Sequence, residues 1–281
     1  MSQRVSVITG GAGGMGLATA KIVGREYSVI ISDVDRDRLD AAAAELKEAG
    51  IACTAVLCDI TDRESVAELV ETSSALGTVA SVIHTAGVSP SMGGAEMIMR
   101  INAVGTVNVN ESFFKVLGEG SAIVNVASMA AHMLPESFVP TKRFGSALRD
   151  EHAFMKKMMA VCGLVPERAR PGMAYSISKS FVRWYCTSQA ARFGSRGARI
   201  LSVSPGSIDT AMGRLEEQSG AGAMIRYAAL KRFGKAEEIA ELLAFCASDK
   251  AGYLTGTDIL CDGGTVASMT LRDKLTVGRK S

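Results

Sequence analysis

The sequence predicts a single α/β domain with a doubly wound parallel sheet of about seven strands and helices on both faces. Short runs of apolar, mostly β-branched residues alternate with amphipathic helical stretches along the whole chain, as expected for such a fold. The apolar runs are nearly continuous, which is typical of strands buried on both faces. The 281 residues contain no repeat, low-complexity tract or interdomain linker, so the prediction is one domain over 1–281.

The predicted elements follow one another in a regular order. RVSVIT forms the first strand at 4–9, a glycine-rich turn leads into a helix at 14–25, and SVIIS at 28–32 precedes the helical stretch 35–49. The later strands are ACTAVL (52–57), VASVIHT (79–85), SAIVNV (121–126), ARILSVS (198–204) and TDILC (257–261). The later helices are expected at 62–75, 95–118, 173–194 and 235–248, where apolar residues recur with helical spacing.

Two segments depart from this alternation. Residues 132–171 hold four of the six prolines, a helical stretch at about 147–161, and seven Lys/Arg against four Asp/Glu. We interpret them as an insertion, because a connection of this length in a compact domain usually has a functional or mobile role. The tail from about 265 is polar near its end. The sequence leaves open whether this tail closes over the site, reaches a partner or is disordered.

Composition excludes several classes of function. The net charge of +2 and the aromatic content of 5% favour neither nucleic acid nor an anionic membrane as partner. No apolar run approaches the roughly 18 residues of a membrane helix, and the N-terminus lacks the layout of a signal peptide. The six cysteines form no C-x-x-C pair or His/Cys cluster, which predicts reduced thiols, no metal site and a cytoplasmic location.

A glycine-rich turn, TGGAGGMG at 9–16, comes directly after the first strand and opens the first helix. Glycines let the backbone approach a pyrophosphate, and the helix N-terminus presents N–H groups to it, as in a Rossmann-type sheet. Asp33 ends the second strand, where a carboxylate can bind both ribose hydroxyls and repel a 2′-phosphate, so NAD is favoured over NADP. Arg36 and Arg38 lie nearby and can meet a phosphate, so NADP remains an alternative. Asp59 ends the third strand, where it is expected to lie near the adenine. Each acid can instead be an ordinary turn residue.

The stretch AYSISKS, 174–180, places Tyr175 four residues before Lys179 in a predicted helix. This spacing brings both side chains to one face of the helix. A neighbouring positive charge favours the phenolate and lowers the pKa of a tyrosine from about 10. The pair is therefore a candidate acid/base, although the same pattern also arises by chance.

Seven motifs in order along almost the whole chain make the sequence resemble the short-chain dehydrogenase/reductase family. The usual N-N-A-G appears as His84, Thr85, Ala86 and Gly87, so only its second half is kept. The distance from Ser128 to Tyr175, 47 residues, is much longer than in most members and is similar to that in hydroxysteroid dehydrogenases and carbonyl reductases with an extra segment. The other matches are Thr9, Gly10, Gly14 and Gly16; Asn102; Ser128; Tyr175 with Lys179; SPGSIDT at 204–210; and YLTGTDILCDGG at 253–264.

The resemblance implies hydride transfer between a secondary alcohol or ketone and nicotinamide. Tyr175 would exchange the proton, Lys179 would hold the nicotinamide ribose, Ser128 would bind the substrate oxygen and Asn102 would hold a water that links Lys179 to solvent. Expected cofactor-binding residues are Gly10, Gly14, Met15, Gly16, Asp33, Asp59, Ile60, Ala86, Gly87, Tyr175, Lys179, Pro205, Gly206, Ile208 and Thr210.

A bulky apolar substrate, such as a hydroxysteroid, is expected from the methionines in segments that leave the carboxyl ends of the strands. Candidate substrate residues are Ser128, Met129, Met133 and Met212, whereas Met155, Met158 and Met159 can equally form the buried stripe of a helix. The family usually forms homodimers or homotetramers through the 95–118 and 173–194 helices. A nucleotide-sensing regulatory protein, an NADP-dependent carbonyl reductase and a nucleotide-sugar epimerase are the alternatives, and the complete Ser128, Tyr175 and Lys179 set favours an enzyme.

Overall fold

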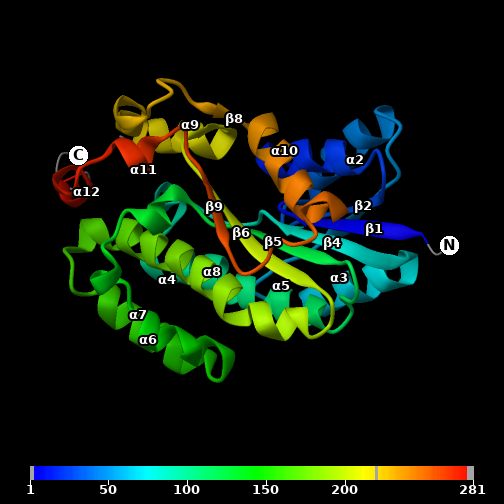
Figure 1. Ribbon diagram of the computed structural model, residues 1–281, viewed down its shortest axis with the longest axis horizontal. Coiled ribbons are helices and arrows are strands. Elements are labelled where there is room, and N and C mark those ends of the chain that lie inside the picture. The colour runs from blue at the N-terminus through cyan, green and yellow to red at the C-terminus, as the bar shows by residue number, and fades with distance from the viewer. Residues whose placement is uncertain (1–2, 219–220, 277–281) are drawn as a thin grey trace.

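A computed structural model describes residues 3–218 and 221–276. Seven strands form one parallel sheet in the order β3-β2-β1-β4-β5-β6-β9 (Figure 1). The predicted strands begin and end within about one residue of those observed, because buried parallel strands read as apolar runs in the sequence. The strands are β1 (Arg4–Thr9), β2 (Ser28–Asp33), β3 (Cys53–Leu57), β4 (Thr78–His84), β5 (Ala122–Val126), β6 (Arg199–Pro205) and β9 (Asp258–Cys261).

Helices cover both faces of the sheet (Figure 1). On one face lie α1 (Gly14–Val23), α2 (Arg36–Glu48) and α10 (Ala236–Ala247), and their apolar residues join one buried cluster with Ile8, Val124 and Leu201 of the strands. On the other face lie α3 (Arg63–Leu76), α5 (Gly105–Phe114) and α8 (Arg170–Gly194). The sheet is therefore doubly wound, as predicted.

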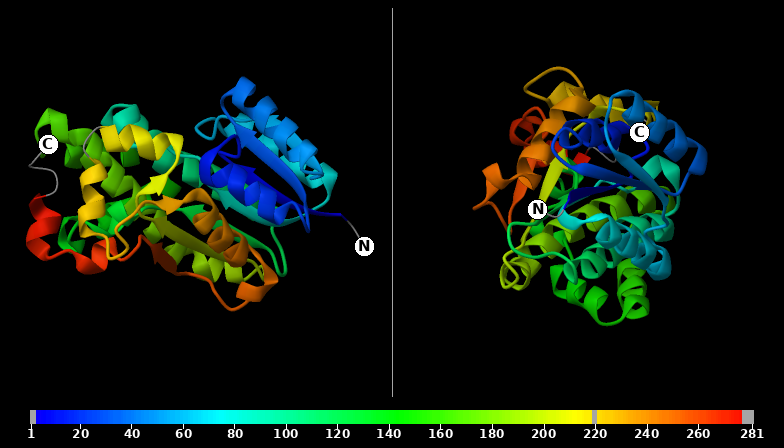
Figure 2. Two further views of the ribbon diagram at one scale, coloured as in Figure 1. Left: turned by 90° about the horizontal axis from the view of Figure 1, so that it is seen from above. Right: turned by 90° about the vertical axis from the view of Figure 1, so that its right-hand side faces the viewer.

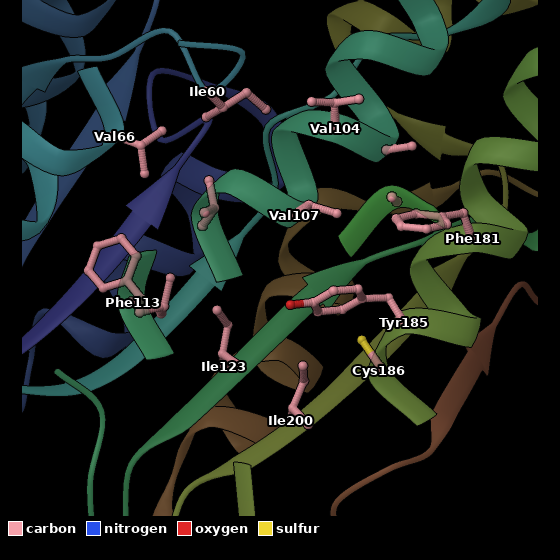
Figure 3. Close-up of a cluster of buried hydrophobic side chains, with 14 of the residues drawn as sticks. Ile60, Val66, Val104, Val107, Phe113, Ile123, Phe181, Tyr185, Cys186 and Ile200 are labelled. Carbon is pink, nitrogen blue, oxygen red and sulfur yellow. The ribbon is translucent and has the colours of Figure 1, made fainter. Parts of the chain in front are cut away.

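The core beneath α5 and α8 is built from large side chains (Figure 3). Tyr185 of α8 and Phe113 of α5 are fully buried and belong to one cluster with Ile123 of β5 and Ile200 of β6. Burying a large side chain contributes about 1.5–3 kcal/mol, so these contacts fix α8 against the sheet. The same helix carries Tyr175 and Lys179 nearer its N-terminus, so its packing against the sheet fixes the position of both.

The helix expected at 95–118 is not continuous. It consists of α4 (Ala95–Met99), a π-helical turn at Arg100–Val104 and α5, which ends at Phe114. The π turn holds Asn102 with its side chain buried. Single π turns of this kind are frequent at functional sites, and the hydrophobic period of the sequence did not reveal this one.

The 132–171 segment folds into a layer of short helices outside α4 and α8 (Figure 1). Phe144 and Phe154 of this layer pack edge-on and tilted against Phe181 of α8. Met155 and Met158 are buried in the same cluster, so they form the buried stripe of their helix. The elements, with the turn that precedes them, are η3 (Met129–His132), η4 (Glu136–Phe138), α6 (Thr141–Phe144), η5 (Gly145–Leu148), α7 (Glu151–Cys162) and η6 (Glu167–Ala169).

The segment between β6 and α10 lies at the carboxyl ends of the strands. A two-residue strand β7 (Ile208–Asp209) pairs with β8 (Gly234–Lys235), and α9 (Ala211–Gln218) and η7 (Ala221–Tyr227) lie between them. Of the predicted tail, α11 (Thr265–Ser268) packs against η7, α12 (Leu271–Thr276) follows, and 277–281 lie outside the described residues. Figure 2 shows these helices at the opposite end of the molecule from the N-terminus.

Within residues 3–218 and 221–276, no helix has the length and apolar character needed to cross a bilayer. The same residues contain no group of three or more His, Cys, Asp or Glu side chains that could hold a metal ion.

Candidate active site

A pocket opens where the carboxyl ends of four strands meet. The order in which strands are added to the sheet reverses between β1 and β4, and ligands of open α/β sheets bind at such switch points. The glycine loop after β1 forms one side of the pocket, and the segments after β4, β5 and β6 form the others. Its lining consists of Met15, Thr85, Gly87, Val88, Val126, Ala127, Ser128, Tyr175, Lys179, Pro205, Gly206, Ile208, Thr210, Met212 and Gly213.

The loop between β1 and α1 fits the pyrophosphate of a dinucleotide. Gly10 has φ +68°, and a Cβ atom there would lie 2.7 Å from the backbone nitrogen of Ala86. A Cβ at Gly16 would lie 2.3 Å from the carbonyl oxygen of Gly10, so neither position accepts a side chain. The N-cap of α1, Gly13, makes no side-chain bond, and the first turn carries no acid. Its N–H groups and positive dipole end therefore remain suited to an anion.

Asp33 and Arg38, at and beyond the end of β2, are the candidates for contact with the adenosine half of such a ligand. Asp33 is half-buried, and its Oδ1 accepts hydrogen bonds from the backbone nitrogens of Val34 and Asp35 at 2.9 and 3.3 Å. The Arg38 guanidinium lies over the glycine loop, because a Cβ at Gly13 would be 3.0 Å from its Nη2. A carboxylate and a guanidinium thus flank this end of the loop.

The end of β3 leads into Asp59 and Ile60, two of the residues expected to bind the cofactor. Asp59 is exposed, and its Oδ1 accepts bonds from the backbone nitrogen and Oγ1 of Thr61, both at 2.8 Å. Ile60 is buried, and a Cβ at Gly105 would lie 2.7 Å from its Cδ1. The side chain of Ile60 therefore packs on α5, so only its backbone can reach a ligand.

Helix α8 presents Tyr175 and Lys179 to the pocket together. The Lys179 side chain is almost fully buried, and its Nζ donates a 2.9 Å hydrogen bond to the carbonyl oxygen of Val126 at the end of β5. That Nζ lies 5.9 Å from the centroid of the Tyr175 ring. Because the cation is anchored to the sheet, its charge stays beside the phenol.

Ser128 reaches the same pocket from β5. It is the N-cap of η3, and its Oγ accepts a 3.2 Å hydrogen bond from the backbone nitrogen of Ala130. The residue is 9% exposed, so its hydroxyl is shielded from bulk water on most sides. A hydroxyl that accepts one bond from the backbone keeps its proton for a ligand oxygen.

Asn102 lies behind the pocket and does not line it. Its Oδ1 accepts from the backbone nitrogen of Val88 and its Nδ2 donates to the Val88 carbonyl oxygen, both at 2.9 Å. A Cβ at Gly87 would lie 3.0 Å from the Oδ1 of Asn102 and 3.4 Å from the Nζ of Lys179. Asn102 and Lys179 therefore both lie close to Gly87, where a side chain would crowd them.

The segment after β6 closes the pocket opposite the glycine loop. A Cβ at Gly14 would lie 3.5 Å from Cγ2 of Thr210, so the two walls face each other at short range. The Oγ1 of Thr210 accepts a 3.1 Å bond from the backbone nitrogen of Gly213, which fixes the start of α9. Met212 lines the same wall.

The predicted substrate residues divide into two groups. Ser128 and Met212 line the pocket, whereas Met129 and Met133 do not. Met129 lies in η3 and Met133 directly follows it, and their assignment to the substrate stays a prediction. The lining also includes Thr85, which the sequence analysis named only as part of its motif, and four residues that it did not name. These are Val88, Val126, Ala127 and Gly213, each within two positions of a predicted site residue in the chain.

Behind the pocket lies His84, a histidine assigned no role from the sequence. Its side chain is buried, with Nδ1 2.7 Å from Oγ1 of Thr9 and Nε2 3.2 Å from Oγ1 of Thr106. Burial, and secondarily the charge of Lys179, lower the pKa of His84 from 6.5 to about 3. The imidazole is therefore neutral at physiological pH.

Comparisons with known proteins agree with this geometry. Residues 4–140 match the family model described as short chain dehydrogenase, and residues 158–266 match one described as enoyl-(acyl carrier protein) reductase. The short-chain dehydrogenase/reductase bsc3 of Alternaria brassicicola is 32% identical over 274 residues, which cover 96% of this chain and 98% of that protein. The chain therefore belongs to the short-chain dehydrogenase/reductase family and is an oxidoreductase of that family.

One further relative and one solved structure are also similar to this chain. The mitochondrial (-)-isopiperitenol/(-)-carveol dehydrogenase of Mentha piperita is 27% identical, and the match covers 94% of each chain. The crystal structure of a short chain dehydrogenase from Burkholderia cenocepacia in complex with NADP superposes with a TM-score of 0.73 at 23% identity. It covers 92% of this chain and 96% of that one, which confirms the predicted fold.

Proposed function

We propose that this protein is an NAD(H)-dependent oxidoreductase that interconverts a secondary alcohol and a ketone, with Tyr175 as the general acid and base. The observation that carries the proposal is one pocket lined by Ser128, Tyr175 and Lys179 together with Met15 of the glycine loop. A proton-transfer group, a hydroxyl for the substrate oxygen and a dinucleotide cradle are what such a reaction requires.

Each residue has a distinct task in this proposal. The nicotinamide ring of a bound cofactor supplies or accepts the hydride. Tyr175 donates its proton to the carbonyl oxygen in reduction and removes the alcohol proton in oxidation. Ser128 donates a hydrogen bond to the same oxygen and stabilises the charge that develops there. Lys179, held by the carbonyl oxygen of Val126, favours the ionised phenol and would hold the nicotinamide ribose.

The cofactor preference rests on Asp33 and Arg38. A carboxylate at the end of β2 supports NAD, because it binds ribose hydroxyls and repels a 2′-phosphate. Arg38 at the glycine loop supports the runner-up, an NADP-dependent carbonyl reductase. We expect Asp33→Ala to raise KM for NAD about tenfold, by loss of charge-assisted hydrogen bonds, and to lower KM for NADP.

The matched variant Arg38→Ala separates the two cofactors in steady-state kinetics. If NAD is the cofactor, Arg38→Ala changes KM for NAD by less than about threefold, within the range of an exposed side chain. Wild-type kcat/KM that is higher with NADP, and that collapses in Arg38→Ala, would show the opposite preference.

The substrate is proposed to be a bulky, largely apolar alcohol or ketone of the hydroxysteroid or carbonyl reductase type. Met15, Val88 and Met212 give the pocket apolar walls around the polar Ser128 and Tyr175, a distribution typical of small-molecule sites. The relative from Mentha piperita named above is, by its name, a dehydrogenase of (-)-isopiperitenol and (-)-carveol, which supports an alcohol as the substrate.

Reduced-nicotinamide formation across a panel of secondary alcohols tests this function directly. The panel runs from cyclohexanol through monoterpenols to hydroxysteroids, with NAD and NADP in turn. We expect kcat/KM to rise with the apolar area of the alcohol. Binding of NAD without turnover of any alcohol, or of the ketones with NADH, would favour a nucleotide-sensing regulatory protein instead.

A further inference from the structure

His84 stands between two parts of the site that are far apart in the sequence. It ends β4, and its neighbours in the sheet are Thr9 on β1 and Asn125 on β5. Toward β1 its Nδ1 contacts Oγ1 of Thr9, the residue that opens the glycine loop, at 2.7 Å. Toward α5 its Nε2 contacts Oγ1 of Thr106 at 3.2 Å. The ring therefore bridges the cofactor cradle and the helix that begins at the π turn.

The hydrogen bonds of this bridge run in one direction. Thr106 donates its hydroxyl proton to the carbonyl oxygen of Asn102 at 2.8 Å, so its oxygen accepts from Nε2–H of His84. Nδ1 is then unprotonated and accepts from the hydroxyl of Thr9. The oxygen of Thr9 in turn lies 3.5 Å from the donating backbone nitrogen of Ala86. One neutral tautomer of His84 satisfies every bond in the chain.

The surroundings hold His84 in that neutral state. Thr9, His84 and Thr106 are each at most 2% exposed, so none of the three exchanges its partner for water. The charged group that bears on the ring is Lys179, which disfavours a second positive charge nearby. An imidazolium would have two donors and no acceptor for the Thr9 hydroxyl, which would break the chain at its cofactor end.

Thr85, the next residue, holds the loop independently. Its Oγ1 donates to the carbonyl oxygen of Thr9 at 2.7 Å. Its hydroxyl donates to the loop and not to α5, so in the described part of the chain His84 alone of this pair joins the two sides. The two residues that replace the family's usual asparagines thus divide their tasks, one fixing the loop and the other linking it to Asn102.

We propose that His84 is a positioning residue that couples the cofactor cradle to Asn102, acting through Thr9 on one side and through Thr106 on the other. This inference rests on the proposed function and on the role that the family resemblance implies for Asn102, which is to hold a water that links Lys179 to solvent. Asn102 and Lys179 meet at Gly87, so a shift of the π turn changes the surroundings of the lysine. Binding of the cofactor at the glycine loop and proton exchange at Lys179 are thereby coupled through the imidazole ring of His84.

Two substitutions divide the bridge into its halves. In His84→Asn the amide oxygen takes the place of Nδ1 and keeps the Thr9 bond, but no group reaches Thr106. In His84→Gln the amide nitrogen takes the place of Nε2 and keeps the Thr106 bond, but the Thr9 bond is lost. Thr106→Val removes the second half while His84 itself stays in place. Ser81→Ala is the matched control, because Ser81 makes a buried 2.7 Å hydrogen bond to Ser6 between the same two strands.

The readouts are the Kd of NADH, from its fluorescence, and the pH profile of kcat. We expect His84→Gln to raise Kd about tenfold, the effect of about one hydrogen bond, and to keep the wild-type pH profile. His84→Asn and Thr106→Val should keep Kd within about threefold, lower kcat about tenfold and shift its pH profile. Ser81→Ala should lower the melting temperature and change neither readout.

The coupling is overturned if both His84 variants behave like Ser81→Ala, because the ring is then only a part of the core. It is also overturned if Thr106→Val leaves the pH profile of kcat unchanged, even where the His84 variants fail to fold. NADH binding requires no turnover. A wild type that binds NADH without turning over any substrate would therefore contradict the proposed function, while the Kd of His84→Gln would still decide for or against the cradle half of the bridge.

Discussion

Tyr175 and Lys179 show what the spacing of two residues reveals and what it does not. Their separation of four residues predicted a shared helix face, and both side chains line one pocket. The hydrogen bond that anchors Lys179 to Val126 joins residues 53 positions apart, and no local pattern indicates such a partner. The same limit applies to His84, whose partners Thr9 and Thr106 come from a different strand and a helix.

The lowered pKa of His84 predicts weaker stability in acid. The folded protein keeps this ring neutral down to about pH 3, whereas the unfolded chain binds the proton at about pH 6.5. Stability therefore falls as pH decreases from 6.5 toward 3, and the loss is about 2 kcal/mol at pH 5. Urea unfolding at pH 7 and pH 5 measures it, with His84→Gln as reference.

Because the glutamine does not titrate, the wild type should lose about 2 kcal/mol more than His84→Gln between these two pH values. Equal losses in the two proteins would show that His84 is protonated in the folded state as readily as in the unfolded chain.

Among the elements, the strands were easier to predict than the interruptions of helices. Apolar runs located all seven strands of the large sheet because both faces of that sheet are covered. The π turn at Arg100–Val104 keeps an apolar period close to that of an α-helix, so the sequence read as one helix over 95–118. The helix expected at 147–161 is Glu151–Cys162, where Asp150 caps its first turn.

The short helix η3 is held in place by a buried charge on β9. Asp258 accepts a 2.8 Å hydrogen bond from Nε2 of His132, the last residue of η3, and Nε of Arg183 lies 3.4 Å from the same oxygen. Arg183 also donates to the carbonyl oxygen of Ala131 at 3.0 Å. Because Ser128 caps η3, this cluster fixes the hydroxyl proposed to hold the substrate.

We expect Asp258→Asn to lower the free energy of unfolding by about 2 kcal/mol, because the hydrogen bond to His132 loses its charge and the ion pair with Arg183 is lost. It should also lower kcat about tenfold through displacement of Ser128. Urea unfolding and steady-state kinetics test both effects. Asp249→Asn is the control, because its pair with Arg4 is exposed and is worth less than about 1 kcal/mol. Full activity in Asp258→Asn would show that η3 keeps its place without the charge.

For the whole molecule, the doubly wound sheet followed from the sequence, but the outer layer did not. The 132–171 segment packs α6 and α7 on α8, and α7 also contacts α4. The sequence predicted an insertion next to the helices that the family uses for assembly. Its burial against Phe181 depended on aromatic contacts between distant residues, which composition does not reveal.

This outer layer bears on assembly. Because it covers part of α8, we expect a homodimer formed through the edge of the sheet at which β9 is the last strand. Phe245 on α10 is 45% exposed and Tyr253 is fully exposed before β9. Light scattering should give twice the chain mass of 29.5 kDa, and Tyr253→Glu should give a monomer. A tetramer that Tyr253→Glu leaves intact would place the interface elsewhere.

The most direct test of the account is the turnover of Tyr175→Phe beside that of Tyr185→Phe. Both tyrosines lie on α8, but the hydroxyl of Tyr185 donates to Oε1 of Glu111 at 2.6 Å in the core, away from the pocket. We predict that Tyr175→Phe loses turnover by at least about a thousandfold, in the range of general acid–base catalysis, and keeps the wild-type Kd for NADH. Tyr185→Phe should lose about 1 kcal/mol of stability and keep its turnover. A Tyr175→Phe variant that still turns over substrate at a rate near that of Tyr185→Phe would contradict the assignment of Tyr175 as the acid and base.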